Sequence, residues 1–155
     1  MRERGFGEEV WTWNPKHQTA GFWLRRMVHD LVVHRFDAEA AASTQNTAPA
    51  GADSALARDL AADGVADLLL CLEMFQGLAG AGETLQFRAT DIPRSWHVTL
   101  TSSGIAWTDG DRPADVTVAA PVLTLLLVLN RRLPAPATVE GDAGLWERWR
   151  AGSRF

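Results

Sequence analysis

Asp30 and His34 are four residues apart in the stretch RRMVHDLVVHRFDAE, residues 25 to 39, and Asp37 follows three positions later. At about 100° per residue, this spacing places their side chains on one face of a helix, where a carboxylate and a neutral imidazole can converge on a divalent metal such as zinc. Such a site needs at least a third protein ligand. Considered alone, an Asp-x-x-x-His pair is more typical of an ion pair within a helix.

Three other residue types invite chemical interpretation. Cys71, in LLLCLEMF, has the apolar neighbours of a buried small side chain rather than of a nucleophile. Arg131 and Arg132 end an apolar segment, where cations complement a helix dipole; binding of an anion is the alternative. His97 alternates with the apolar residues of its segment, so we expect it to face solvent.

Two helical segments must position Asp30 and His34. Residues 19 to 42 lack proline, and residues 54 to 79 follow Asp53, a candidate N-cap, after the loop STQNTAPAGA. The dipeptide at positions 63–64, Asp-Gly, is expected to kink or divide the second helix. Two helices do not close a bundle, so their apolar faces must be covered by the C-terminal domain, by a second copy of the chain or by another protein, and a twofold homodimer is the simplest closed solution. The residues expected on those faces are Trp23, Met27, Leu31, Val33, Leu69, Leu72 and Phe75.

The second half of the chain alternates with a period of two, which predicts short strands. The expected strands are TLQFRAT, SWHVTLT, GIAW and ADVTVAA, which form a mainly antiparallel meander, and ATVEG as a fifth. A buried helix is expected at 121–132. A closing helix is expected in DAGLWERWR, with Asp142 as its N-cap. The predicted fold is therefore α+β: a helical pair in residues 1–80 and a small α+β domain in residues 81–155.

Composition excludes several classes of function. The net charge of −4 and the pI near 5.5 argue against nucleic-acid binding, which needs a basic surface. The longest apolar runs, PVLTLLLVL and LLLCL, are far shorter than the ~20 residues that span a bilayer. One cysteine cannot form an internal disulfide, and no signal peptide is evident. We therefore expect a soluble cytoplasmic protein that binds neither nucleic acid nor membranes.

Several stretches, taken in order, resemble the mycothiol-dependent maleylpyruvate isomerase family of actinobacteria. They run from about Val10 to Trp149 and are VWTWNP, GFWLRRMVHDLVVHRFDAE, LAADGVADLLL, LQFRATD, WHVTL, ADVTVAAPVLTLLLVLNRRLP and VEGDAGLWERW. The resemblance implies a DinB-like four-helix bundle that holds a divalent metal, commonly zinc, followed by an α+β domain similar to sterol carrier proteins. It also implies chemistry in which the mycothiol thiolate adds to maleylpyruvate, the new single bond rotates, and elimination gives fumarylpyruvate.

The resemblance places Asp30 and His34 on the family's Glu-x-x-x-His metal-binding pair. It also makes Arg131 and Arg132 candidates for holding the carboxylates of substrate or cofactor. The chain departs from the family because Asp30 is one methylene shorter than glutamate, and because the first two bundle helices, with their histidine ligand, have no counterpart.

Three interpretations follow. The first is a shortened mycothiol-dependent isomerase or thiol transferase that completes its site from a partner chain. The second is a non-catalytic binding or dimerisation module. The third is a fragment of a full-length family member.

Overall fold

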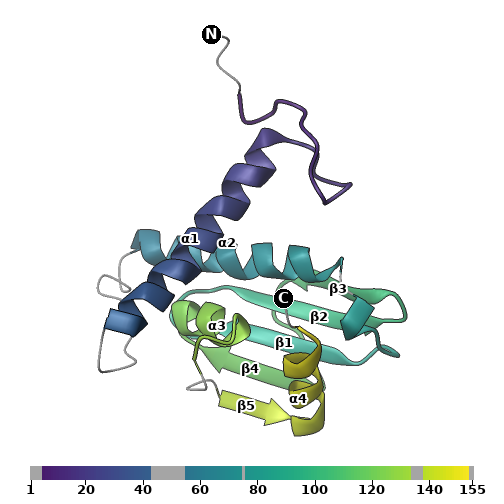
Figure 1. Cartoon of the computed structure of the whole chain (residues 1–155). Helices are drawn as coiled ribbons and strands as arrows, with labels where there is room; N and C mark the ends of the chain where they lie inside the picture. The colour runs from purple at the N-terminus through teal and green to yellow at the C-terminus, as the bar shows by residue number, and fades with distance from the viewer. Residues whose placement is uncertain (1–4, 43–54, 75, 134–137, 154–155) are drawn as a thin grey trace. The chain divides into compact units, whose positions relative to one another are not determined.

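The computed structural model describes residues 5–42, 55–74, 76–133 and 138–153. Its contacts divide the chain into two compact units, residues 1–47 and 48–155 (Figure 1). The first unit contains α1 (Ala20–Ala42). The second contains α2 (Ala55–Leu72), the 3-10 helix η1 (Gln76–Leu78), β1 (Thr84–Ala89), β2 (Ser95–Thr101), β3 (Gly104–Asp109), β4 (Val116–Ala120), α3 (Val122–Leu129), β5 (Thr138–Gly141) and α4 (Ala143–Gly152). The α+β class predicted from the sequence is confirmed.

The five strands form one mixed sheet in the order β3-β2-β1-β4-β5. The pairs β1–β2, β2–β3 and β4–β5 are antiparallel, whereas β4 pairs with β1 in parallel. The expected meander is therefore correct for three strands and wrong for the fourth. Residues 110–115, called the crossover segment below, return the chain past β2 to the far side of β1. Alternation identifies a strand and its faces, but it does not identify the strand's neighbour.

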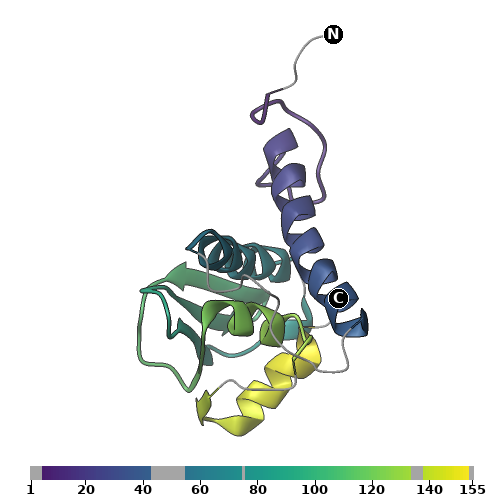
Figure 2. The same ribbon diagram turned by 90° about the vertical axis from the view of Figure 1, so that its left-hand side faces the viewer.

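The sheet has one apolar face, which carries the core of the second unit. Its fully buried side chains are Leu85, Phe87, Trp96, Val98, Leu100, Val116 and Val118. α2, α3 and α4 lie on this face (Figure 2), and Trp149 of α4 meets Phe87 with ring centroids 5.1 Å apart. The opposite face carries polar residues at the alternate positions, including Thr84, Gln86 and His97. Among the described residues of the second unit, α2, α3 and α4 therefore pack on the apolar face.

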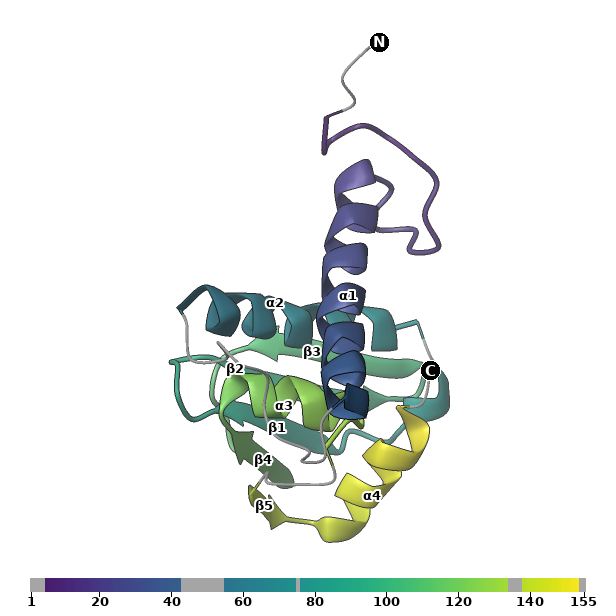
Figure 3. The ribbon, with the colours of Figure 1, turned by 60° about the vertical axis from the view of Figure 1, so that its left-hand side comes forward.

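The predicted buried helix is confirmed as α3, in which six of eight residues are buried. It packs beside α2 over the sheet (Figure 3). Its apolar character on all sides reflects this position between a helix and a sheet. Within the described residues, no helix is both long and apolar enough to cross a membrane.

α2 corrects two expectations. It runs unbroken through Asp63 and Gly64, and Gly64 is buried, so packing overrides the local tendency of this dipeptide to break a helix. Leu69 and Leu72, which were expected on an uncovered face, are buried in a helix that packs against α3 and β3. The loop at 43–52, the candidate cap Asp53 and the apolar Phe75 lie outside the described residues.

The closing helix α4 begins as expected. Asp142 is its N-cap, and its Oδ1 accepts a hydrogen bond from the Leu145 backbone N–H at 3.0 Å. This bond satisfies one of the backbone donors left unpaired at a helix start. The Asp142 backbone N–H in turn donates to the Asp115 carbonyl at 2.9 Å, so the same residue ties the start of α4 to the end of the crossover segment.

Candidate functional site

The structure brings Asp30 and His34 together on α1. His34 Nε2 lies 3.7 Å from Asp30 Oδ2, and His34 Nδ1 lies 3.1 Å from Asp37 Oδ2. The side chains are open to solvent, 59% exposed for His34 and 47% for Asp30. Both imidazole nitrogens therefore face carboxylates of their own helix, and Asp37 joins the pair on the predicted face.

This donor set does not fit a divalent metal on its own. A zinc site needs at least three protein ligands at about 2 Å, whereas these three side chains form exposed ion pairs spaced along one helix. Across residues 5–42, 55–74, 76–133 and 138–153, no group of three or more His, Cys, Asp or Glu side chains could hold a metal ion. The arrangement supports ion pairing, worth a few tenths of a kcal/mol for each exposed helical pair.

An exposed apolar stripe runs beside this pair. The α1 stripe consists of Leu24, Met27, Val28 and Leu31, each of which is exposed. At about 100° per residue, these four lie within one narrow sector of the helix, and His34 lies at its edge next to Met27. Because apolar patches on a protein surface often mark contact sites, the stripe is a candidate interface.

The buried face of α1 differs from the one expected. The buried residues are Phe22, His29, Val33 and Phe36. Met27 and Leu31 are exposed as expected, but Val33 is buried. Trp23 is half-buried, and its indole Nε1–H donates to the Trp11 carbonyl at 2.9 Å.

Arg131 and Arg132 follow α3, and each guanidinium donates to a backbone carbonyl. Arg131 has a positive φ of 63°, and its guanidinium donates to the Arg150 carbonyl. Arg132 donates from its guanidinium to the Asn130 carbonyl at 2.9 Å. These contacts agree with the interpretation of the pair as helix-end cations, and the carboxylate-binding role stays a prediction.

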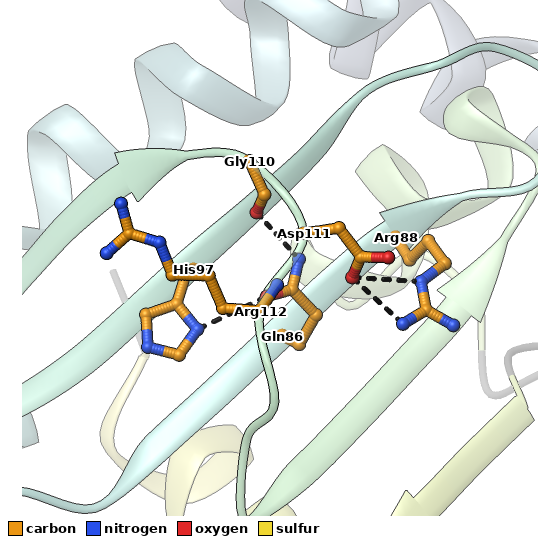
Figure 4. A network of polar contacts seen from close by, with 6 residues as sticks. All are labelled: Gln86, Arg88, His97, Gly110, Asp111 and Arg112. Atoms are coloured by element: carbon orange, nitrogen blue, oxygen red, sulfur yellow. Dashed lines mark hydrogen bonds and ion pairs between the residues drawn. The ribbon is translucent and has the colours of Figure 1, made fainter.

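The polar face of the sheet carries a network that the sequence did not indicate (Figure 4). Gln86 is fully buried under the crossover segment, and its Nε2 donates to the Gly110 carbonyl at 3.1 Å. Its Oε1 accepts from the Arg112 backbone N–H at 3.2 Å and lies 3.2 Å from His97 Nδ1. Because Oε1 can only accept, His97 must carry a proton on Nδ1. Gln86 therefore fastens the crossover segment to the sheet.

His97 is half-buried, so it is less exposed to solvent than expected. It does lie on the polar face, but the crossover segment covers part of it. Burial lowers the pKa of His97, and the nearby charge of Arg112 lowers that pKa further, while Asp115 acts in the opposite direction. The crossover segment thus favours the neutral imidazole.

A second anchor holds the other end of the crossover segment. Asp115 Oδ2 accepts from the Thr84 backbone N–H at 2.7 Å and from the Thr84 hydroxyl at 2.9 Å. Both bonds lower the pKa of Asp115, and the bond from the Thr84 backbone N–H has the larger effect. The polar residues of this face therefore hold the crossover segment against the sheet. They are far apart in the sequence and come together only through strand pairing.

The sequence matches no protein-family profile, and no curated protein matches it. Similar solved structures include a double mutant of the sec-alkyl sulfatase PisA1 (TM-score 0.46, 16% identity) and the stereoselective inverting sec-alkylsulfatase Pisa1 from Pseudomonas sp. (TM-score 0.43, 16% identity). Both cover 85% of this chain, which spans only 29% of the length of either sulfatase. A ubiquinone synthesis protein, UbiJ-SCP2, covers 69% of this chain, and 93% of its own length is matched (TM-score 0.42, 17% identity). At these TM-scores the similarities carry no inference about activity.

Proposed function

We propose that this chain is an association and binding module with the architecture of the maleylpyruvate isomerase family. In this proposal, it lacks mycothiol-dependent isomerase activity unless another chain completes its metal site. The observation that carries the proposal is the α1 stripe, an exposed apolar surface beside the two-ligand pair of Asp30 and His34. The order of family-like stretches along the sequence and the helices-then-sheet organisation support the choice of family.

The charges along α1 favour a second copy of the chain as the occupant of the stripe. Arg25 and Arg26 lie toward its N-terminal end, whereas Asp30, Asp37 and Glu39 outnumber the single Arg35 toward its C-terminal end. An antiparallel twofold pair would place the basic end of one helix against the acidic end of the other. A parallel arrangement would bring like charges together.

Such a homodimer does not complete a metal site. The stripe is centred between Met27 and Val28, and His34 lies between six and seven residues beyond that centre. With a rise of 1.5 Å per residue, the two His34 side chains would be about 20 Å apart along an antiparallel pair. A self-associated module is therefore non-catalytic, with the small carboxylate substrate and mycothiol remaining properties of the resembled family.

A second candidate function is favoured by the position of the Asp30–His34 pair at the edge of the stripe. A helix of another chain docked there would lie next to both side chains and could supply the missing histidine. The chain would then contribute half of a zinc-dependent, mycothiol-dependent isomerase acting on a small carboxylate such as maleylpyruvate.

Zinc binding distinguishes the two candidates. We expect the isolated chain to bind zinc weakly or not at all at neutral pH, because two exposed ligands do not make a site. Asp30→Glu should raise the affinity only slightly. Isothermal titration calorimetry tests this expectation, with Asp37→Asn as a control for the neighbouring carboxylate. Tight stoichiometric binding that His34→Ala abolishes would contradict the non-catalytic proposal, and isomerisation of maleylpyruvate with added mycothiol would then be the assay to run.

Self-association tests the stripe itself. Light scattering coupled to gel filtration at micromolar concentration should give a dimer, and Leu31→Glu should give a folded monomer because it places a charge in the apolar surface that the dimer would bury. Leu31 is the most exposed residue of the stripe, at 67%. Met74→Glu is the matched control, since Met74 is also an exposed apolar side chain but lies outside the stripe. A wild-type monomer that unfolds cooperatively would contradict the proposal.

A further inference from the structure

A cavity of about 450 Å³ opens at the end of the sheet, between the β1–β2 turn and the residues that follow β3. Arg88 and Ser95 are register partners on β1 and β2 and line one part of it. The Gly110 backbone N–H donates to the Ser95 carbonyl at 3.0 Å and joins the two connections there. The volume lies within the range of small-molecule sites, which is about 300–1,000 Å³.

Two ion pairs flank this cavity. Arg88 donates from Nε and a terminal nitrogen to Asp111 Oδ1, at 3.3 and 2.9 Å, and Figure 4 shows this pair beside the crossover segment. Arg94 donates to Asp109 Oδ1 at 3.1 Å. All four charged residues line the cavity. Their side chains are between 44% and 64% exposed, so each pair remains accessible to a ligand.

The pairs leave much of their hydrogen-bonding capacity unused. A guanidinium has five N–H donors. Within the described part of the chain, Arg94 uses one of them and Arg88 uses two. From the residues that the structure describes, both aspartates receive hydrogen bonds at Oδ1 only, so each Oδ2 can still accept. The site therefore offers donors for an anion and acceptors for a cation at once.

Arg94 is held in place from below. Its guanidinium carbon lies 5.9 Å from the centre of the Trp96 ring, which is fully buried. Cation–π attraction and the Asp109 contact restrain the side chain from two directions. A restrained guanidinium loses less conformational freedom on binding a ligand than a free surface arginine does.

We infer that this cavity binds a small zwitterion, a molecule that carries both a carboxylate and a protonated amine, such as an amino acid or a short peptide. The carboxylate takes the unused donors of Arg94, because the planar guanidinium matches a carboxylate. The ammonium group takes the free oxygens of Asp109 and Asp111. Two cations and two anions make the site neutral, which disfavours a ligand with a single sign of charge. This inference does not depend on the proposed function.

Glycylglycine is the probe that tests the inference, in a titration followed by ¹H–¹⁵N NMR. The backbone amides of Arg94, Ser95 and Gly110 should shift in a saturable way. Acetate and methylamine, each carrying one of the two charges, should bind more weakly. Arg94→Gln should weaken glycylglycine binding about tenfold or more, since charge-assisted bonds are lost. Arg150→Gln, which removes an exposed paired arginine elsewhere in the second unit, should leave the affinity unchanged.

Asp109→Asn separates the two halves of the interaction. It should weaken glycylglycine binding more than acetate binding, because it removes the negative charge that attracts the ammonium group. Spectra of the free variants show whether each one is folded. The inference is overturned if acetate binds wild type as well as glycylglycine does, if Arg94→Gln binds glycylglycine like wild type, or if no saturable shift appears at these amides at millimolar glycylglycine.

Discussion

Gly141→Ala is expected to lower the free energy of unfolding by about 3 kcal/mol or more, combining backbone strain of roughly 1–3 kcal/mol with overpacking of a similar size. Gly141 ends β5 with a φ of +101°, which side-chain-bearing residues rarely adopt. A Cβ at this position would clash with the Asp115 carbonyl oxygen. That oxygen also accepts from the Asp142 N–H, so it cannot move away without loss of the bond that ties α4 to the crossover segment.

Gly82→Ala is the matched control for this prediction. Gly82 has a φ of +112°, yet no heavy atom of the described residues, its two chain neighbours apart, lies within 4 Å of a Cβ placed on it. It therefore carries the strain of a positive φ without the clash. Urea unfolding of both variants should show a clearly larger loss for Gly141→Ala. Equal losses would mean that β4 and β5 can separate to admit the methyl group, contrary to the contact described above.

Local signals explain which parts of the fold were predictable from the sequence. Asp142 was identified as a cap because capping needs only the residue type and its place before a helical pattern. The strands were found from their alternation, and α3 from its apolar run. The parallel pairing of β4 with β1 was missed, because it depends on the path of the crossover segment and on packing between distant residues. α2 passes through Gly64 for a related reason, since burial outweighs local propensity.

In the candidate site, too, contacts set by local sequence spacing were predictable and contacts set by tertiary packing were not. The approach of Asp30 to His34 follows from the four-residue spacing on a helix, and the structure confirms it. Which side of α1 is buried could not be read reliably, because apolar residues such as Phe22 and Leu31 occur on opposite sides of this helix. Gln86 and the cavity arginines lie close to their partners only through strand pairing, so nothing in the local sequence marks them.

Gln86→Leu is expected to cost about 2–4 kcal/mol, because it removes three hydrogen bonds worth roughly 0.5–1.5 kcal/mol each while keeping a side chain of similar size. Urea unfolding measures the loss. Thr117→Val is the control, since it removes a hydroxyl from the same face of the sheet that makes no hydrogen bond within the described residues. We expect the control to stay within about 0.5 kcal/mol of wild type.

The mechanism behind that loss can be tested apart from its size. If Gln86 fastens the crossover segment, the Arg112 amide should exchange its hydrogen faster in Gln86→Leu, and the pKa of His97 should rise toward its ordinary value as burial and the Arg112 charge recede. The pKa of His97 is lowered in the folded state, so the unfolded chain binds a proton more readily. The free energy of unfolding of the wild type should therefore decline as the pH falls from 6.5, the ordinary pKa of histidine, toward the lower pKa of His97 in the folded protein. That decline should be smaller in the variant. An Arg112 amide that keeps its protection, together with an unchanged His97 pKa, would show that the remaining contacts, chiefly those of Asp115 with Thr84, hold the segment without Gln86.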